Sequence, residues 1–123
     1  MIVFTESNNN FIEIVLLTDG LKKIKSSKRQ ISSSQTDEFI QQIDKLIRDQ
    51  GDQIKGIFIK PDLESYTSVR IAFTIVNFLG FSCNIQPVAV NSIEQINLEA
   101  IEKFDHPLLP EYKNGPNITR AKR

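Results

Sequence analysis

This sequence of 123 residues has one cysteine, one histidine and a net charge of zero. Each of these excludes a kind of site or partner. The single cysteine, Cys83, allows neither an internal disulfide nor a zinc site built from thiolates. The single histidine, His106, allows no metal site of the paired-histidine type, and we expect it to be a surface residue. The 15 basic and 15 acidic residues cancel, so no overall field attracts the chain to nucleic acid or to a membrane.

Long apolar runs are lacking as well. Residues 1–20 contain no basic segment followed by an apolar core of signal-peptide length, and the longest apolar-rich run is too short to span a membrane. We therefore expect a cytoplasmic protein with no membrane partner. A chain of this length is expected to form one domain that buries roughly two-thirds of its unfolded-state surface.

Basic residues gather in two places despite the balanced total. The first group lies between residues 22 and 29 and the second near the end of the sequence. Their members are Lys22, Lys23, Lys25, Lys28 and Arg29, and then Lys113, Arg120, Lys122 and Arg123. Each group is either a solvated surface or a contact for an RNA backbone. Because prolines interrupt the last part of the sequence, we predict a folded lobe over 1–105 and a Pro-rich basic tail over 106–123.

The first 28 residues indicate three strands. Residues 1–4 are apolar, and residues 11–17 alternate, with Ile12 and Ile14 on one side and Glu13 and Val15 on the other. Thr18, Asp19 and Gly20 are typical of a hairpin turn centred on the Asp-Gly pair. Residues 21–28 then predict an exposed third strand whose lysines protect the sheet edge.

The next part alternates helix and strand. A helix ending near Gly51 is predicted from the apolar spacing of Phe39, Ile40, Ile43, Leu46 and Ile47. A strand over 54–59, a helix over 67–81 and a strand over 86–90 follow. Ser92, with Gln95 at capping-box spacing, predicts a third helix. The order βββαβαβα predicts an α/β protein with a mixed five-stranded sheet, and by analogy of topology a single ribonuclease-H-like, or actin-like ATPase, lobe.

The helix predicted over 67–81 is apolar around most of its circumference. Only Arg70, Thr74 and Asn77 form a polar stripe, which Phe73 and Phe81 flank. A helix that is apolar around its whole circumference is usually buried on two opposite sides. The side that the sheet leaves uncovered is expected to meet either the first helix or another chain.

The segment that leads into this helix resembles the TsaB (YeaZ) family, whose loop reads Gly-Pro-Gly-Ser-Phe/Tyr-Thr-Gly-Leu-Arg-Ile-Gly after a buried strand. The residues that match it are Ser65, Tyr66, Thr67, Arg70 and Ile71. The segment from Pro87, which reads PVAVNSIEQI, is similar to the family's strand and Ser-Leu-Glu helix start. Weaker likenesses lie at residues 35–43 and at residues 110–119. Together these segments cover most of the chain.

This resemblance implies a non-catalytic subunit of the machinery that makes threonylcarbamoyladenosine in tRNA. It implies binding to a TsaD-type catalytic ATPase through a bundle of two helices from each protein. A TsaE-type ATPase is implied as a further partner. The resemblance also implies a homodimer when the chain is alone, and an indirect contact with tRNA. No cofactor and no catalytic residue are expected. By position, the implied interface residues are Arg70, Phe73, Thr74, Asn77 and Phe81.

The sequence also departs from the family pattern. Asp62, Leu63 and Glu64 replace Gly-Pro-Gly, and Ser68 and Ala72 replace two later glycines, so this loop must have another shape. Glu6 follows the first strand where actin-like folds face a phosphate, which a carboxylate would repel. Fewer than twenty residues follow the third predicted helix, which indicates a one-lobe form that holds no nucleotide between two lobes of its own.

Particular residues also suggest two enzymatic interpretations. A nucleophile elbow at Ser65 is excluded, because Leu63 and Thr67 occupy the glycine positions; Ser65 or Thr67 is expected to cap the helix instead. A metal-dependent nuclease of the ribonuclease-H-like class would place its carboxylates near Glu6, near Asp37 or Glu38, and near Asp62. The remaining alternative is a homodimeric interaction module of another purpose.

Overall fold

The computed structural model describes residues 1–7, 11–30, 40–41, 43–45, 48–49, 53–61 and 66–110. Strands β1 (Ile2–Ser7), β2 (Phe11–Leu17) and β3 (Lys23–Gln30) come first, and residues 40–41, 43–45 and 48–49 are helical. They are followed by β4 (Gly56–Lys60), helix α2 (Tyr66–Cys83), β5 (Val88–Ala89) and the 3₁₀ turns η2 (Ile93–Gln95) and η3 (Leu98–Ala100).

These strands form one mixed five-stranded sheet in the order β3-β2-β1-β4-β5, which confirms the predicted sheet. Strand β1 pairs antiparallel with β2 and parallel with β4, while β3 and β5 form the two edges. The predicted hairpin turn is present, because the Leu21 amide donates to the Thr18 carbonyl across Asp19 and Gly20 (2.8 Å). Its left-handed residue is Leu21 (φ 67°) rather than the glycine.

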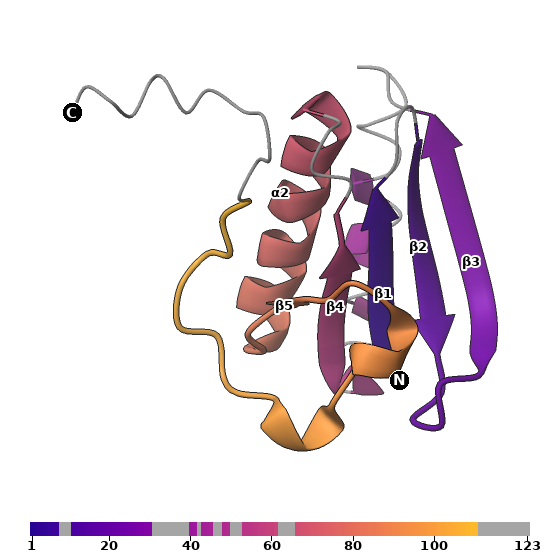
Figure 1. Cartoon of the computed structure of the whole chain (residues 1–123), viewed down its shortest axis with the longest axis vertical. Coiled ribbons are helices and arrows are strands. Elements are labelled where there is room, and N and C mark those ends of the chain that lie inside the picture. The colour runs from indigo at the N-terminus through magenta and orange to yellow at the C-terminus, as the bar shows by residue number, and fades with distance from the viewer. Residues whose placement is uncertain are drawn as a thin grey trace.

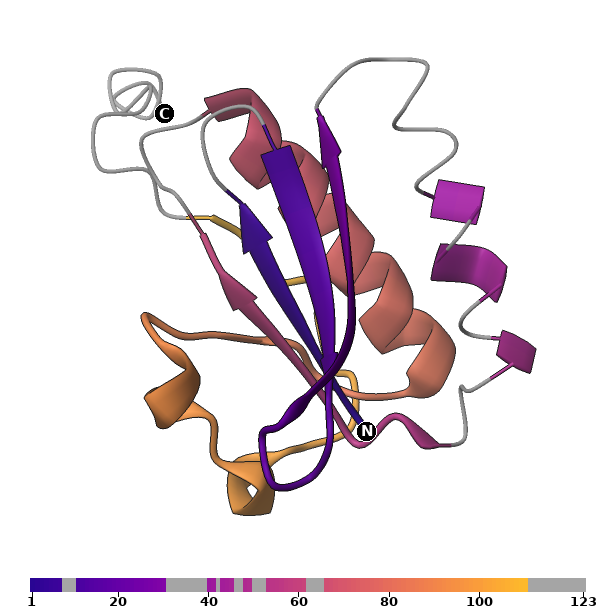
Figure 2. The ribbon, with the colours of Figure 1, turned by 90° about the vertical axis from the view of Figure 1, so that its right-hand side faces the viewer.

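Each face of the sheet has its own apolar layer, as the alternation of strand β2 predicted. Figure 2 shows α2 and the helical residues 40–41, 43–45 and 48–49 on one side of the sheet and the two 3₁₀ turns on the other. The helix side joins Val3, Ile12, Ile14, Ile57 and Ile59 to Ile43 and to Val69, Ala72, Phe73, Ile75, Val76 and Leu79. The opposite side joins Ile2, Phe4, Leu17, Phe58 and Val90 to Ile93, Ile96, Leu98 and Ile101.

One polar side chain is enclosed in the helix-side layer. Thr5 in β1 lies between Ile14 and Ile59 in the strand register and is fully buried. Among the described residues, its hydroxyl has no hydrogen-bond partner. A buried hydroxyl without a partner costs about 1–3 kcal/mol of stability.

The prediction of a third helix from Ser92 is wrong. The structure has only the turns η2 and η3 there, and Ser92 makes no side-chain cap. The Gln95 side chain instead accepts a hydrogen bond from the Asn91 amide (2.7 Å). In an α-helix, the apolar residues 93, 96, 98 and 101 would not share one face, whereas two short turns separated by extended backbone bring all four to the sheet. Strand β5 is also shorter than the predicted strand over 86–90.

The helix predicted over 67–81 is confirmed as α2 and extends slightly further at both ends. It ends where Asn84 adopts a left-handed conformation (φ 58°) and the Ile85 amide donates to the Gly80 carbonyl (2.9 Å). This is a Schellman motif, and the buried Ile85 supplies its apolar contact. Since α2 begins at Tyr66, the backbone of Thr67 lies inside its first turn.

The first predicted helix is confirmed where the structure describes it, over 40–41, 43–45 and 48–49. Ile43 is buried in the helix-side layer as expected, but Ile40 remains 41% exposed, so its assignment to the buried face is wrong. Phe39, Leu46 and Ile47 lie outside the described residues, as do the predicted helix ends.

Candidate protein-binding surface on helix α2

The outer face of α2 carries exposed aromatic side chains beside an arginine. Phe81 is 73% exposed and Phe78 is 42% exposed, and Arg70 and Thr74 are exposed on the same side of the helix. The Thr74 hydroxyl donates to the Arg70 carbonyl (2.9 Å), so it is satisfied within the helix. Within the described part of the chain, Arg70 makes no ion pair.

Phe73 does not belong to this face. It is only 4% exposed and packs in the helix-side layer, so its place among the expected interface residues is corrected. Phe73 lies on the opposite side of the Arg70–Thr74–Phe81 stripe from Phe78. The apolar circumference of the helix concealed which of its phenylalanines faces outward.

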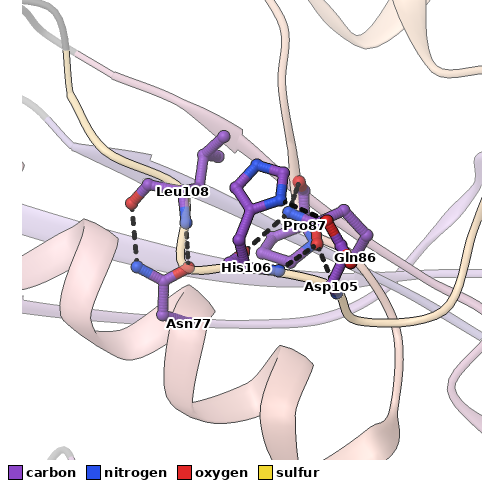
Figure 3. Close-up of polar contacts among 6 residues, drawn as sticks. All are labelled: Asn77, Gln86, Pro87, Asp105, His106 and Leu108. Atoms are coloured by element: carbon purple, nitrogen blue, oxygen red, sulfur yellow. Dashed lines mark hydrogen bonds and ion pairs between the residues drawn. The ribbon is translucent and has the colours of Figure 1, made fainter.

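Asn77 is half-buried because it binds another part of the chain. Its amide nitrogen donates to the Leu108 carbonyl (2.9 Å), and its amide oxygen accepts from the Leu108 amide (2.8 Å). Both partners are backbone atoms (Figure 3). Asn77 therefore holds the segment after residue 101 against α2, and its two polar groups are used within the chain.

Gln86 holds the same segment at a second point. Its side-chain oxygen accepts from the amides of Asp105 (2.8 Å) and His106 (3.2 Å), and its nitrogen donates to the His106 carbonyl (3.1 Å). Gln86 is only 9% exposed, so these bonds are partly shielded from water. Figure 3 shows both amides directed at the same stretch of backbone. We call Asn77 and Gln86 together the amide clamp.

Apolar contacts complete the attachment. The rings of Phe81 and Phe104 meet edge to face, with centroids 5.9 Å apart and planes at 85°. A Cβ at Gly80 would lie 2.8 Å from Pro87 and 3.2 Å from Phe104, so the absent side chain admits both residues. Because Phe104 contacts Phe81 and Leu108 contacts Asn77, residues 104–108 run antiparallel to α2. In Figure 1 this segment is the orange-to-yellow chain that passes beside α2.

From residue 106 onward the sequence predicts a tail, so this attachment was not expected. His106 and Leu108 are held by hydrogen bonds, whereas residues 111–123 lie outside the described part of the chain. His106 is exposed, as expected, and its Nδ1 lies 2.9 Å from Asp105 Oδ2. The available signal was a pair of amides, Asn77 and Gln86, each set among apolar neighbours.

The predicted loop and nuclease residues fall mostly outside this surface. Ser65, Asp37, Glu38 and Asp62 lie outside the described residues, and the side chains of residues 66 and 67 do as well. Glu6 lies opposite Lys60 on the neighbouring strand, with Nζ 3.5 Å from Oε2. Over the described ranges, no group of three potential metal ligands is present.

The sheet order, with helices on one face and short turns on the other, defines a single α/β lobe of the ribonuclease-H-like class. Solved structures give the particular likeness. The chain is similar to YeaZ from Pseudomonas aeruginosa, with a TM-score of 0.56 and 19% identity over 75% of this chain and 44% of that one. It is also similar to an uncharacterized protein described as similar to peptidase YeaZ from Pseudomonas aeruginosa, with a TM-score of 0.54 and 18% identity over 75% of this chain and 43% of the other.

The chain thus spans less than half the length of either structure and resembles one lobe of YeaZ. No protein-family model matches the sequence, and no curated protein matches it. Among the helices of the described residues, none is long and apolar enough to cross a membrane.

Proposed function

We propose that this chain is a non-catalytic, cytoplasmic subunit of the machinery that makes threonylcarbamoyladenosine in tRNA. It binds the TsaD-type catalytic ATPase through the outer face of α2 and activates it. The likeness of the fold to one lobe of YeaZ supports the choice of partner. The choice of this surface rests on the exposure of Phe81, whose side chain is 73% exposed. The same helix presents Arg70, which makes no ion pair among the described residues.

The physical basis is the burial of this aromatic face. Exposed aromatic residues and arginines are the side chains that most often dominate binding energy at protein interfaces. Phe81 and Phe78 supply apolar area, and Arg70 supplies a charge that a carboxylate of the partner can meet. The same face could pair with a second copy in the absence of the partner, since a two-fold contact between identical helices is self-complementary.

Further contacts of the complex are part of the same proposal. Lys23, Lys25 and Lys28 are exposed on the edge strand β3, on the far side of the sheet order from β5. Their positive charge would attract the phosphate backbone of a tRNA that the complex holds. A TsaE-type ATPase would join through the catalytic subunit.

Co-purification of the chain with the TsaD-type subunit of the same genome tests the proposal. The test variant is Phe81→Glu, which places a charge in the interface without disturbing the core. The matched control is Ile24→Glu on β3, where an apolar residue is likewise exposed (55%). Phe73→Glu is unsuitable, because a buried charge at a residue 4% exposed would unfold the lobe.

We expect the wild type and Ile24→Glu to form a stable complex and Phe81→Glu to lose at least about 30-fold in affinity, as for a central interface aromatic. Failure of the wild type to bind would refute the proposal. Self-association of the wild type without binding to the catalytic subunit would instead support a homodimeric module.

A further inference from the structure

Strand β3 is the long edge of the sheet. It has 8 residues, whereas the opposite edge strand, β5, has 2. In the sheet that the structure describes, no strand lies beyond β3, which is the right-hand edge in Figure 1. Every second residue of an edge strand directs its N–H and C=O groups away from the sheet, so such a strand can accept a further one through backbone hydrogen bonds.

The regular part of this edge lies over residues 25–30. The register with β2 shifts between Leu16 and Leu17, so Ile24 is an extra residue and a bulge interrupts the pairing there. Residues 25–30 then pair one to one with residues 16–11 of β2. Lys28 is directed back over the sheet, because its Nζ lies 5.0 Å from the centre of the Phe11 ring on β2. Residues 25–30 therefore offer a regular template.

Positive charge marks the beginning of this template. Lys23 and Lys25 are exposed, and within the described ranges neither of them makes an ion pair. Lysines at a sheet edge oppose pairing with an apolar or a basic strand. Opposite charges across a strand pair stabilise it instead. The charge of this edge therefore favours a strand that carries carboxylates.

We propose that β3 binds an extended acidic segment of another protein. The segment adds antiparallel to residues 25–30 as a further strand, and its carboxylates lie beside Lys23 and Lys25. Backbone hydrogen bonds supply the affinity in this mode of binding, and side-chain contacts supply the specificity. The inference does not depend on the proposed function, although a tRNA at the same lysines would compete with the added strand.

Two other occupants fit the edge less well. A second copy that paired through its own β3 would bring lysines against lysines, and like charges across a strand pair destabilise it. An RNA strand would meet the lysines with phosphates, but it has no peptide groups with which to continue the sheet. An acidic peptide segment satisfies both the charge and the backbone of the edge.

The test uses the full chain and a fluorescent peptide as long as β3. Alternating valine and threonine in the peptide lead to two glutamates at its C-terminal end, and binding is followed by anisotropy. The same peptide with all of its amide nitrogens methylated keeps the carboxylates but cannot donate backbone hydrogen bonds. Lys25→Glu is the test variant. Lys103→Glu is the matched control, because Lys103 is also exposed and lies away from β3. Circular dichroism checks that both variants fold.

We expect the peptide to bind the wild type and Lys103→Glu equally, and Lys25→Glu about tenfold more weakly at low salt. The methylated peptide should bind the wild type at least about tenfold more weakly than its parent. Hydrogen exchange at alternate amides of residues 25–30 should become slower in the complex with the unmethylated peptide.

Several results would overturn the inference. They are failure of the acidic peptide to bind the wild type, unchanged binding by Lys25→Glu, and equal binding of the methylated and unmethylated peptides. Binding of a single-stranded RNA of equal charge in place of the peptide would show a contact made by charge alone. None of these results affects the binding of the TsaD-type subunit through α2, which Phe81→Glu tests separately.

Discussion

Gly80 lies inside helix α2, where glycine normally lowers stability. Its replacement by alanine tests how tightly Ile85, Pro87 and Phe104 pack against the helix. In an open helix, Gly→Ala stabilises by about 1 kcal/mol, because alanine loses less backbone entropy on folding. Here we expect the opposite sign. The added Cβ would lie 2.6 Å from the Ile85 carbonyl oxygen and 2.8 Å from Pro87 Cδ.

The magnitude follows from which neighbour can move. The Ile85 carbonyl belongs to the helix-ending turn in which the Ile85 amide bonds to the Gly80 carbonyl (2.9 Å), so it cannot withdraw without straining that bond. Overpacking against such a neighbour costs about 1–3 kcal/mol, and the loss of the bond about 1 kcal/mol more. After the helix-propensity gain of about 1 kcal/mol, we expect Gly80→Ala to lower the free energy of unfolding by about 1–3 kcal/mol.

Urea and thermal unfolding followed by circular dichroism measure this change. Each kcal/mol corresponds to roughly 4 °C in Tm for a domain of this size. Ser82→Ala is the matched control, since Ser82 is exposed on the same helix and alanine there should raise stability by about 0.5 kcal/mol. A Gly80→Ala protein as stable as the wild type or more stable would refute the packing argument.

Three further changes have expected outcomes. Thr5→Val replaces a buried hydroxyl that has no partner among the described residues, so urea unfolding should give a gain of about 1 kcal/mol. Asn84→Gly relieves the left-handed conformation after α2 (φ 58°), and Tm should rise by an amount equivalent to roughly 0.5–1 kcal/mol, whereas Asn84→Ala should lower it. A hydrogen bond from Lys55 holds the pKa of Asp19 below its ordinary value of 3.8, so its stabilising contribution is present above that pH and lost as the pH falls through the folded-state pKa. Asp19→Asn should therefore reduce the loss of stability on acidification below that value; an unchanged acid limb would contradict the assignment.

Much of the fold was predictable because it depends on short-range pattern. The alternation in β2 assigned Ile12 and Ile14 to one layer and Val15 to the other, and the structure confirms it. The apolar run before residue 60, the long helix after it and the short strand that follows predicted a parallel crossover, which β4, α2 and β5 form. Residues near one another in sequence were enough for these elements.

The region after β5 was predicted wrongly for an equally physical reason. Ser92 and Gln95 have the spacing of a capping box, and local spacing favoured a helix. The sheet instead needed Ile93, Ile96, Leu98 and Ile101 on one surface, which a helix cannot present. Burial against a distant strand therefore outweighed a local capping preference.

By itself, the sequence determined the order of the elements, the mixed sheet and the helix that carries the candidate surface, because hydrophobic periodicity of 2 or 3.6 residues records local geometry. Only the tertiary structure decided that Phe73 is buried and Phe81 exposed, and that Asn77 and Gln86 hold residues 105–108. The hold on residues 105–108 depends on hydrogen bonds between residues 19 to 31 positions apart, such as Asn77 with Leu108. A helix that is apolar on all sides does not reveal which arc meets the sheet, and an amide does not reveal its distant partner.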